Sequence, residues 1–243
     1  MIYPLCALLT GQVNALGRRG APSGIAKSPV AGPIMLGPTG FEGDAQGDTK
    51  HHGGPEKAVH HYPFDHYATW TAEIGPHARL AEPGAFGENL STLGLTEDVV
   101  AIGDVFSLGG AVLEVSQGRQ PCWKLNERFD IPDMARRVQT SGRTGWYYRV
   151  LQPGAIGPTD RLERIGRADP AWTLRRIWHC FYVDRLNPIE LEALARLPKL
   201  AEGWRRHAER RLETQSVEDW TRRLDGASEK NRAADGKVSH EPG

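Results

Sequence analysis

The stretch Ser116-Gln117-Gly118-Arg119-Gln120-Pro121-Cys122-Trp123-Lys124-Leu125-Asn126 sets a cysteine in a turn directly after a strong strand signal. Residues 111–116 alternate in the β-branched manner of a strand, and Gly118 and Pro121 then stop the ladder. We therefore expect Cys122 to lie at a strand end.

Two cations accompany this cysteine. Arg119 and Lys124 lie within three residues of Cys122. Nearby positive charge stabilises the thiolate, which is the nucleophilic and metal-binding form of the side chain. The alternative for the same stretch is a buried structural cysteine, because free cysteine is among the most buried residue types.

Length and charge narrow the class of protein. The 243 residues can bury a large core, and the 30 basic and 30 acidic residues cancel. No global charge attracts a nucleic acid polymer, and no apolar run approaches the roughly 18 residues of a membrane span. Residues 1–10 lack a basic start and a cleavage pattern, so we expect a first strand there and no signal peptide.

The three cysteines are far apart. Cys6, Cys122 and Cys180 form no disulfide framework and no C-x-x-C pair for zinc or redox chemistry. This usage indicates a reducing compartment, and we expect the protein in the cytoplasm.

Residues 1–167 have the composition of an irregular, mainly β domain, with glycine and proline between short apolar runs. The pattern favours a closed barrel over a sandwich only slightly. Two helices are expected within it, at 63–73 and 132–140, the second ended by Gly142. The expected strands are residues 5–13, 58–61, 105–108, 111–116 and 146–151.

The pattern changes at residues 168–226, where a small all-α domain is predicted. Asp169-Pro170 and Asn187-Pro188 each resemble an N-cap followed by proline at the first helical position. Further helices are expected at 201–212 and, from a capping-box-like start at Ser216, up to Leu224. Residues 227–243 have almost no large apolar side chains and are predicted to be disordered.

Residues 43–63 are rich in histidine, glycine and lysine, and three interpretations are open. Zinc would suit the histidines, although no H-E-x-x-H or C-x-x-C accompanies them. A solvated loop is the plain alternative. A third suits the residues better: Gly53 and Gly54 allow the backbone to approach a ligand, and Lys50, His52 and Lys57 can donate to an anion.

Residues 86–90, Phe-Gly-Glu-Asn-Leu, form a second candidate. Glu88 and Asn89 could present an acceptor and an amide to a heterocycle. The same residues could equally form a turn in which Asn89 bonds its own backbone.

Several motifs together resemble the MOSC domain, the molybdenum cofactor sulfurase C-terminal domain, and within it the YiiM-like 6-N-hydroxylaminopurine resistance proteins. The match covers about residues 1–226, and its order and spacing make it specific. The motifs are residues 40–44 (GFEGD), 52–55 (HGGP), Lys57-Ala58, 61–63 (HYP), 86–91 (FGENLS), 116–126 and 144–146 (TGW).

The resemblance implies a MOSC-type β-barrel followed by a three-helix-type domain, and a pocket for the molybdenum cofactor (molybdopterin). Cys122 stands at the position of the family's presumed molybdenum ligand. The family is also associated with pyridoxal phosphate, to which we assign no residue. Departures are His51, His60 and Gly118, and no family role is carried onto the two histidines.

The leading hypothesis is a molybdoenzyme that reduces N-hydroxylated compounds, such as hydroxylaminopurine-type bases, to amines. Arg119, Lys124, Lys50 and His52 would hold the cofactor, and Glu88 and Asn89 the pterin edge or the substrate. A separate flavin or iron–sulfur reductase would supply electrons. Two alternatives are a carrier of cofactor or sulfur on Cys122 and, more weakly, a zinc hydrolase, and the sequence leaves a homodimer open.

Overall fold

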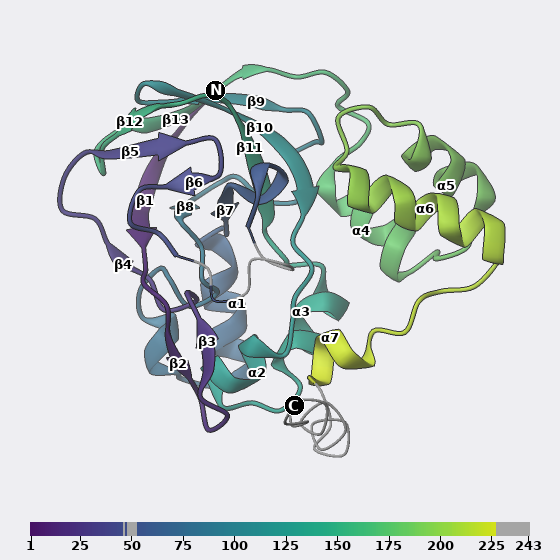
Figure 1. The fold of residues 1–243 in the computed structure, drawn as a ribbon, viewed down its shortest axis with the longest axis horizontal. Coiled ribbons are helices and arrows are strands. Elements are labelled where there is room, and N and C mark those ends of the chain that lie inside the picture. Colours follow the sequence, from purple (N-terminus) through teal and green to yellow (C-terminus); the bar gives the residue numbers. More distant parts are fainter. Residues whose placement is uncertain (46, 48–52, 227–243) are drawn as a thin grey trace, which may run out of the picture.

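The computed structural model describes residues 1–45, 47 and 53–226, and its centre is a closed seven-stranded barrel (Figure 1). The strands follow the order β13-β9-β10-β11-β7-β8-β1, and β1 pairs with β13 to close the ring. The barrel strands are β1 (Ile2–Thr10), β7 (Val59–His61), β8 (Leu90–Thr92), β9 (Val105–Leu108), β10 (Ala111–Gly118), β11 (Trp146–Gln152) and β13 (Arg161–Gly166). The predicted mainly β barrel is confirmed.

Strand β10 shows how the sequence forms the barrel wall. It pairs with β9 on one side and β11 on the other, so it is a central strand, and Leu113 and Val115 are fully buried. The predicted strands at β7, β9, β10 and β11 are confirmed. The first strand expected within residues 1–10 is confirmed, whereas the bounds 5–13 are wrong by three residues at each end, because pairing with β13 begins at Ile2.

Short strands lie outside the ring. Strand β4 extends the sheet beside β1, while β12, β5 and β6 form a separate sheet and β2 pairs with β3. Their bounds are β2 (Asn14–Leu16), β3 (Ala21–Ser23), β4 (Ser28–Pro29), β5 (Ile34–Gly37), β6 (Gly40–Phe41) and β12 (Gly154–Ile156). These strands were not predicted, because each has only two to four residues and such short segments show no clear alternation.

Three helices cover one end of the barrel: α1 (Asp65–Ile74), α2 (Lys124–Phe129) and α3 (Met134–Ser141). They pack around a second apolar cluster that contains Trp70, Phe129 and Val138. Helices α1 and α3 confirm the two predicted inside the barrel domain, and α3 ends at Gly142, whose φ of 73° suits glycine. Helix α2 was not predicted, because six residues are too few to show a helical period.

The C-terminal part contains α4 (Leu174–Tyr182), α5 (Pro188–Ala195) and α6 (Glu202–Thr214). These helices form the expected three-helix domain, beside β10 in Figure 1. The cap at Asn187 is confirmed, because its side chain accepts from the amides of the first turn of α5. The cap at Asp169 is wrong: Thr173 caps α4 instead, and the carboxylate of Asp169 accepts from Ala171 N in a preceding turn.

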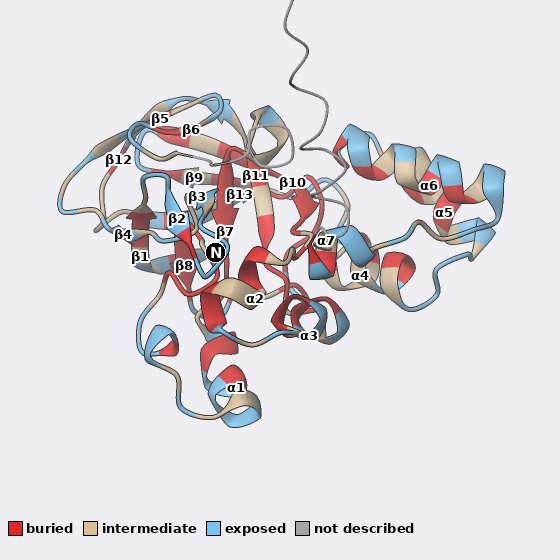
Figure 2. Ribbon diagram, turned by 60° about the horizontal axis from the view of Figure 1, so that its bottom comes forward, coloured by how far each residue is buried: buried red, intermediate tan, exposed pale blue. Residues whose placement is uncertain are grey.

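The last helix, α7 (Thr221–Asp225), corrects the expected helical bundle. The chain leaves α6, runs back across the molecule and places α7 against α2 and α3, as both ribbon views show (Figures 1 and 2). Leu224 is 1% exposed and belongs to the second apolar cluster of the barrel domain. The cap expected at Ser216 is not formed, since Asp219 accepts from Thr221 N at this turn.

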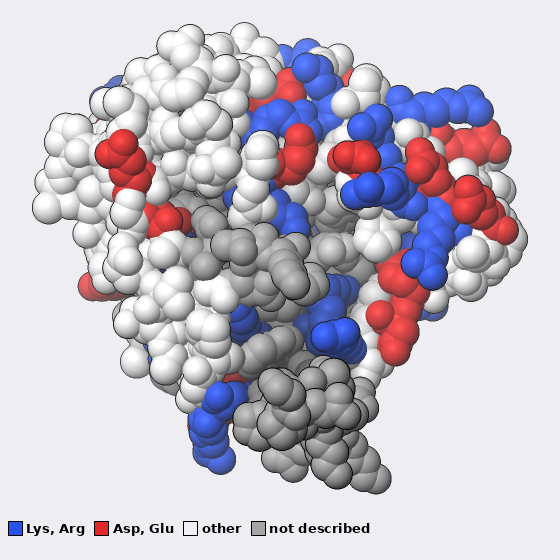
Figure 3. All heavy atoms as spheres, in the orientation of Figure 1, with Lys and Arg blue, Asp and Glu red and all other residues white. Residues whose placement is uncertain are grey.

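Charges on the helical domain are mixed. Acidic and basic side chains are interspersed there on the face in Figure 3, with i,i+4 pairs such as Arg206 with Glu202. In the part of the chain that the structure describes, no helix is both long and apolar enough to cross a bilayer. The tail at 227–243, expected to be disordered, lies outside the described residues.

Candidate functional site

A pocket opens where the Cys122 turn, the residues after η1 (Pro55–Lys57) and the loop before β8 meet. It encloses about 690 Å³ including its open mouth. The motifs singled out in the sequence thus converge in space. The described lining residues are Ser23, Gly24, Ile25, Lys27, Asp44, Ala45, Gly47, Gly53, Lys57, Ala58, His60, Phe86, Gly87, Asn89, Arg119, Gln120, Cys122, Lys124 and Tyr147.

Cys122 lies in the turn between β10 and α2, as predicted, and is half-buried at the pocket wall. The turn is tied to the rest of the barrel through Arg119, whose amide donates to the Gly145 carbonyl at 3.0 Å. Helix α2 begins directly after it, where Leu125 N donates to the Cys122 carbonyl at 2.9 Å. The thiol is therefore carried on backbone that is fixed on both sides.

Lys57 reaches the same wall from η1. Burial lowers the pKa of its ammonium, and the neighbouring Cys122 acts in the opposite direction. The short helix is held on β10, because Ser116 Oγ and Gln117 Nε2 both donate to the Glu56 carbonyl, at 2.7 and 2.9 Å. The strand that precedes Cys122 thus also positions its cationic neighbour.

Arg119 is the most unusual group of the pocket. Its side chain is 6% exposed, and its Nη1 has no hydrogen-bond partner among the described residues. Its Nη2 reaches the Phe86 carbonyl only at 3.4 Å. A buried charged donor without a partner costs about 1–3 kcal/mol or more, so the site retains a donor that a bound ligand could use.

His60 and Tyr147 stand beside Arg119. Their rings lie 5.0 Å apart, and His60 Nε2 is also buried without a partner among the described residues. Burial lowers the pKa of His60 well below its usual range, and Arg119 adds to this effect, so the imidazole is neutral. Burial raises the pKa of Tyr147, which remains a neutral hydroxyl.

The opposite wall carries a buried ion pair between Lys27 and Asp44. Burial lowers the pKa of Lys27, and Asp44 opposes the shift. Asn89 supports the pair, because its Nδ2 donates to Asp44 Oδ2 at 2.9 Å and to the Leu9 carbonyl at 3.1 Å. Its Oδ1 accepts from His60 N, so the Asn89 amide bridges three segments of the protein.

Glu88 requires a correction. It is fully buried and is not among the described lining residues. Its carboxylate accepts from Tyr67 Oη and from the amides of Gly84 and Phe86. Glu88 therefore shapes the turn below the pocket, in place of the ligand-binding role expected from the sequence.

The remaining predicted residues divide as follows. Gly53 lines the pocket, and Gly53 and Gly54 both have φ of 87°, a conformation that favours glycine. Lys124 is buried at the wall and donates through Nζ to the Pro22 carbonyl at 3.0 Å. Lys50, His52 and His51 lie outside the described residues.

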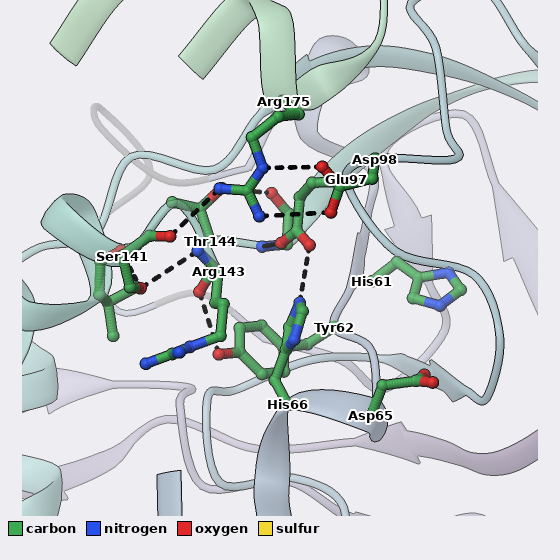
Figure 4. Close-up of polar contacts among 12 residues, drawn as sticks. His61, Tyr62, Asp65, His66, Glu97, Asp98, Ser141, Arg143, Thr144 and Arg175 are labelled. Carbon is green, nitrogen blue, oxygen red and sulfur yellow. Dashed lines mark hydrogen bonds and ion pairs between the residues drawn. The ribbon is translucent and has the colours of Figure 1, made fainter. Parts of the chain in front are cut away.

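The other histidines of the motif serve the core. His61 is fully buried between Tyr148 Oη and Thr92 Oγ1, at 3.0 and 2.9 Å, and burial lowers its pKa to about 3. His66 Nε2 lies 2.7 Å from the carboxylate of Glu97 (Figure 4). No group of three metal-ligating side chains occurs within residues 1–45, 47 and 53–226.

Glu97 connects this network to the pocket. Its second oxygen accepts from Gly145 N at 2.7 Å, and the Gly145 carbonyl in turn accepts from Arg119 N. Arg175 of α4 closes the arrangement, because it pairs with Asp98 and donates to the Ser141 carbonyl (Figure 4). The helical domain therefore braces the loop behind Arg119.

Sequence reasoning missed Lys27 and Tyr147 and gave His60 no role. Asp44 belongs to the GFEGD motif, and in the structure its carboxylate pairs with Lys27 and accepts from Asn89 Nδ2. Lys27 lies in an irregular segment that carries no periodic signal. Tyr147 could have been found from the outward alternation of β11, where its neighbours Trp146 and Tyr148 are fully buried.

Comparison with known proteins agrees with this architecture. Residues 48–163 match the MOSC domain, and residues 172–215 match the YiiM-like, 3-alpha helix domain. The chain is 41% identical over 229 residues to Protein YiiM of Escherichia coli, covering 93% of this chain and all of that protein. The crystal structure of YiiM from Escherichia coli superposes with a TM-score of 0.77 at 36% identity, covering 92% of this chain and 98% of that one.

A fungal protein matches over part of its length. A protein named Reductase from Gibberella moniliformis is 40% identical over 179 residues, which are 73% of this chain and 31% of that protein.

Proposed function

Since this chain belongs to the MOSC family and to its YiiM-like branch, we propose that it is a molybdenum-cofactor-dependent oxidoreductase that reduces N-hydroxylated compounds to amines. Base analogues of the 6-N-hydroxylaminopurine type are the proposed substrates. One observation carries the proposal: a half-buried cysteine borders a pocket that holds a buried arginine, whose Nη1 has no hydrogen-bond partner among the described residues.

The charges of the pocket fit the molybdenum cofactor. Its described lining includes four Lys or Arg side chains and one carboxylate, Asp44, which neutralises Lys27. An anionic group would offset the remaining positive charge, and the cofactor carries both a phosphate and a pterin with several acceptors. Arg119 Nη1 offers the donor that such a group requires.

The roles of the residues follow from their positions. Cys122 would ligate molybdenum through its soft thiolate, and Lys57, Arg119 and Lys124 would hold the cofactor beside it. Lys50 and His52 are proposed to join them. The bound cofactor would supply the two-electron chemistry that removes oxygen from nitrogen. Overall, R–NHOH, two electrons and two protons give R–NH₂ and water.

Electrons must reach this pocket from another protein or domain. The sequence has three cysteines, and once Cys122 binds molybdenum the two others cannot hold an iron–sulfur cluster. No G-x-G-x-x-G follows a strand, so a dinucleotide site in this chain is unsupported. The name of the fungal relative, Reductase, supports a reductive activity, and about two thirds of that protein lies outside the match.

A carrier of cofactor or sulfur on Cys122 is the second candidate, because the same residues would serve it. The third, a zinc hydrolase, has no described metal-ligand cluster to support it. The carrier and the enzyme differ only in turnover of a substrate.

The experiment has two steps. Protein produced in cells that make the cofactor is analysed for molybdenum, and is then assayed anaerobically with 6-N-hydroxylaminopurine and a dithionite-type reductant. We expect about one molybdenum per chain and formation of adenine. Molybdenum without turnover would favour the carrier, and protein that contains no molybdenum after such production would refute the proposal.

A further inference from the structure

Helix α7 lies away from α5 and α6 and close to the turn that carries Cys122 (Figure 1). It packs against α2 and α3 at the cysteine-bearing turn, residues 119–124, and Leu224 anchors it in the second apolar cluster (Figures 1 and 2). Neither family match reaches it, since they end at residues 163 and 215. Its packing therefore needs an explanation of its own.

Arg223 of α7 contacts the peptide groups on both sides of Cys122. Its backbone carbonyl accepts from Trp123 N at 2.8 Å, and its Nη1 donates to the Pro121 carbonyl. Its Nη2 donates to Gln139 Oε1 of α3, which fixes the guanidinium in place. One residue, about 100 positions further along the chain, thus contacts the backbone on both sides of the cysteine.

The segment is held independently of the Arg223 side chain. Asn126 Nδ2 donates to the Leu224 carbonyl at 2.9 Å. Gly226 is buried with φ of 83°, and a Cβ there would lie 2.4 Å from Arg19 Nη1 and 3.3 Å from the Trp123 ring. The end of α7 is therefore inserted between Arg19 and Trp123, and only glycine fits this position.

The turn depends on such contacts. Trp123 is the N-cap of α2, and the first amides of a helix have no partner within it. The Pro121 carbonyl lies beyond the strand ladder, which ends at Gly118, and accepts from Arg223. Without an outside donor and acceptor, these groups would be free to reorient and would move Cys122 with them.

We propose that Arg223 is a positioning residue for Cys122 and that α7 clamps the cysteine-bearing turn through its two flanking peptide groups. This role does not require the proposed function, because it concerns the protein without cofactor. The proposal also connects the C-terminal helical region to the site, because the chain that leaves α6 returns to the pocket and forms α7 there.

The test is hydrogen exchange, followed by mass spectrometry, on the full-length cofactor-free chain. In Arg223→Ala, we expect the peptide covering 119–126 to exchange about tenfold faster, since a hydrogen bond to a charged donor is lost. Peptides from α4 to α6 should exchange as in the parent. Arg223→Lys should restore most of the protection, and Arg222→Ala, at an exposed neighbour, should match the parent.

A second readout follows the thiol itself. On a Cys6→Ser background, alkylation of Cys122 by iodoacetamide at one fixed pH should accelerate by a similar factor in Arg223→Ala, while the buried Cys180 stays unmodified. If Arg223→Ala does not fold, Arg223→Met is used in its place, because methionine keeps an aliphatic stem of similar length and lacks the guanidinium. Exchange and alkylation equal to the parent, in whichever variant folds, would overturn the proposal.

Discussion

Replacing Arg119 by methionine should change stability and cofactor binding in opposite directions. Arg119 is 6% exposed, and its Nη1 bonds no described residue. Its Nη2 reaches the Phe86 carbonyl only at 3.4 Å. Removing a buried donor that has no described partner relieves a penalty of about 1–3 kcal/mol. The long bond to Phe86 contributes less stabilisation than this, so its loss does not cancel the gain. We expect the free energy of unfolding of the cofactor-free protein to stay level or rise by about 1 kcal/mol.

Cofactor affinity should fall instead. A hydrogen bond from a charged group contributes about 1.5–3 kcal/mol, so we expect roughly 10- to 100-fold weaker retention. Urea unfolding measures the first quantity, and molybdenum content after dialysis the second.

Arg128 provides a matched control, because it is a buried arginine at 7% exposure whose guanidinium is used. Its Nε and Nη2 donate to the carbonyls of Ala85 and Gly84 at 2.8 and 2.7 Å. Arg128→Met leaves both carbonyls without these donors and should lower the free energy of unfolding by about 2–4 kcal/mol. If Arg119→Met were as destabilising as Arg128→Met, or retained molybdenum like the parent, the reasoning about the unused donor would be refuted.

Four further predictions concern Cys122, His61, Glu97 and the source of electrons. Cys122→Ser should abolish turnover and molybdenum retention with an unchanged thermal midpoint, while Cys6→Ser stays active; near-parent reduction by Cys122→Ser would contradict the metal assignment. The pKa of His61 is about 3 in the folded protein, so below pH 6.5 this residue is protonated in the unfolded chain and neutral in the folded one. His61 should therefore lower the free energy of unfolding by about 1.4 kcal/mol for each pH unit below 6.5. His61→Gln should flatten that slope in urea titrations between pH 7 and pH 5, and an unchanged slope would oppose the assignment. Glu97→Ala removes the acceptor of His66 and Gly145 and should lower the free energy of unfolding by about 2–5 kcal/mol. The control Asp98→Ala, at an exposed ion pair with Arg175, should lower it by less than about 1 kcal/mol. Equal losses in the two variants would argue against the network. NADPH alone should give no steady turnover, and turnover without an added reductase would exclude the need for an external donor.

Local sequence patterns were sufficient where one segment determines the outcome. The strand before Cys122, the glycine and proline that end it and the adjacent cation Arg119 all lie within eleven residues, and the structure places them as predicted. The cap of α5 at Asn187 succeeded for the same reason. The helical nature of residues 168–226 was predicted from local caps and periodicity, whereas the MOSC-type closed barrel came mainly from the resemblance, because closure of a barrel depends on pairings such as β1 with β13 that no local pattern reveals.

The wrong predictions concern residues whose role depends on contacts with segments that are distant in the sequence. The Glu88 carboxylate could face a pocket or its own turn, and the choice depends on Tyr67 and on amides that only the fold brings near. Asp169 and Thr173 are both good caps, but the backbone at Thr173 pairs with Ala101, so the barrel decides where α4 begins. A helix at the end of the chain was foreseen, yet its contacts with the barrel were not.

These contacts explain how a short turn can hold a thiol in one place. From one side, Arg175 of α4 holds the loop at Ser141, whose continuation at Gly145 accepts the Arg119 amide. From the other side, Arg223 of α7 holds the peptide groups that flank Cys122. The thiol proposed as a metal ligand must keep its geometry to within about 0.5 Å, and a turn with no ladder of its own gains that rigidity only from neighbouring elements. The helical extension therefore belongs to the site, because it braces the cysteine and its arginine from two directions.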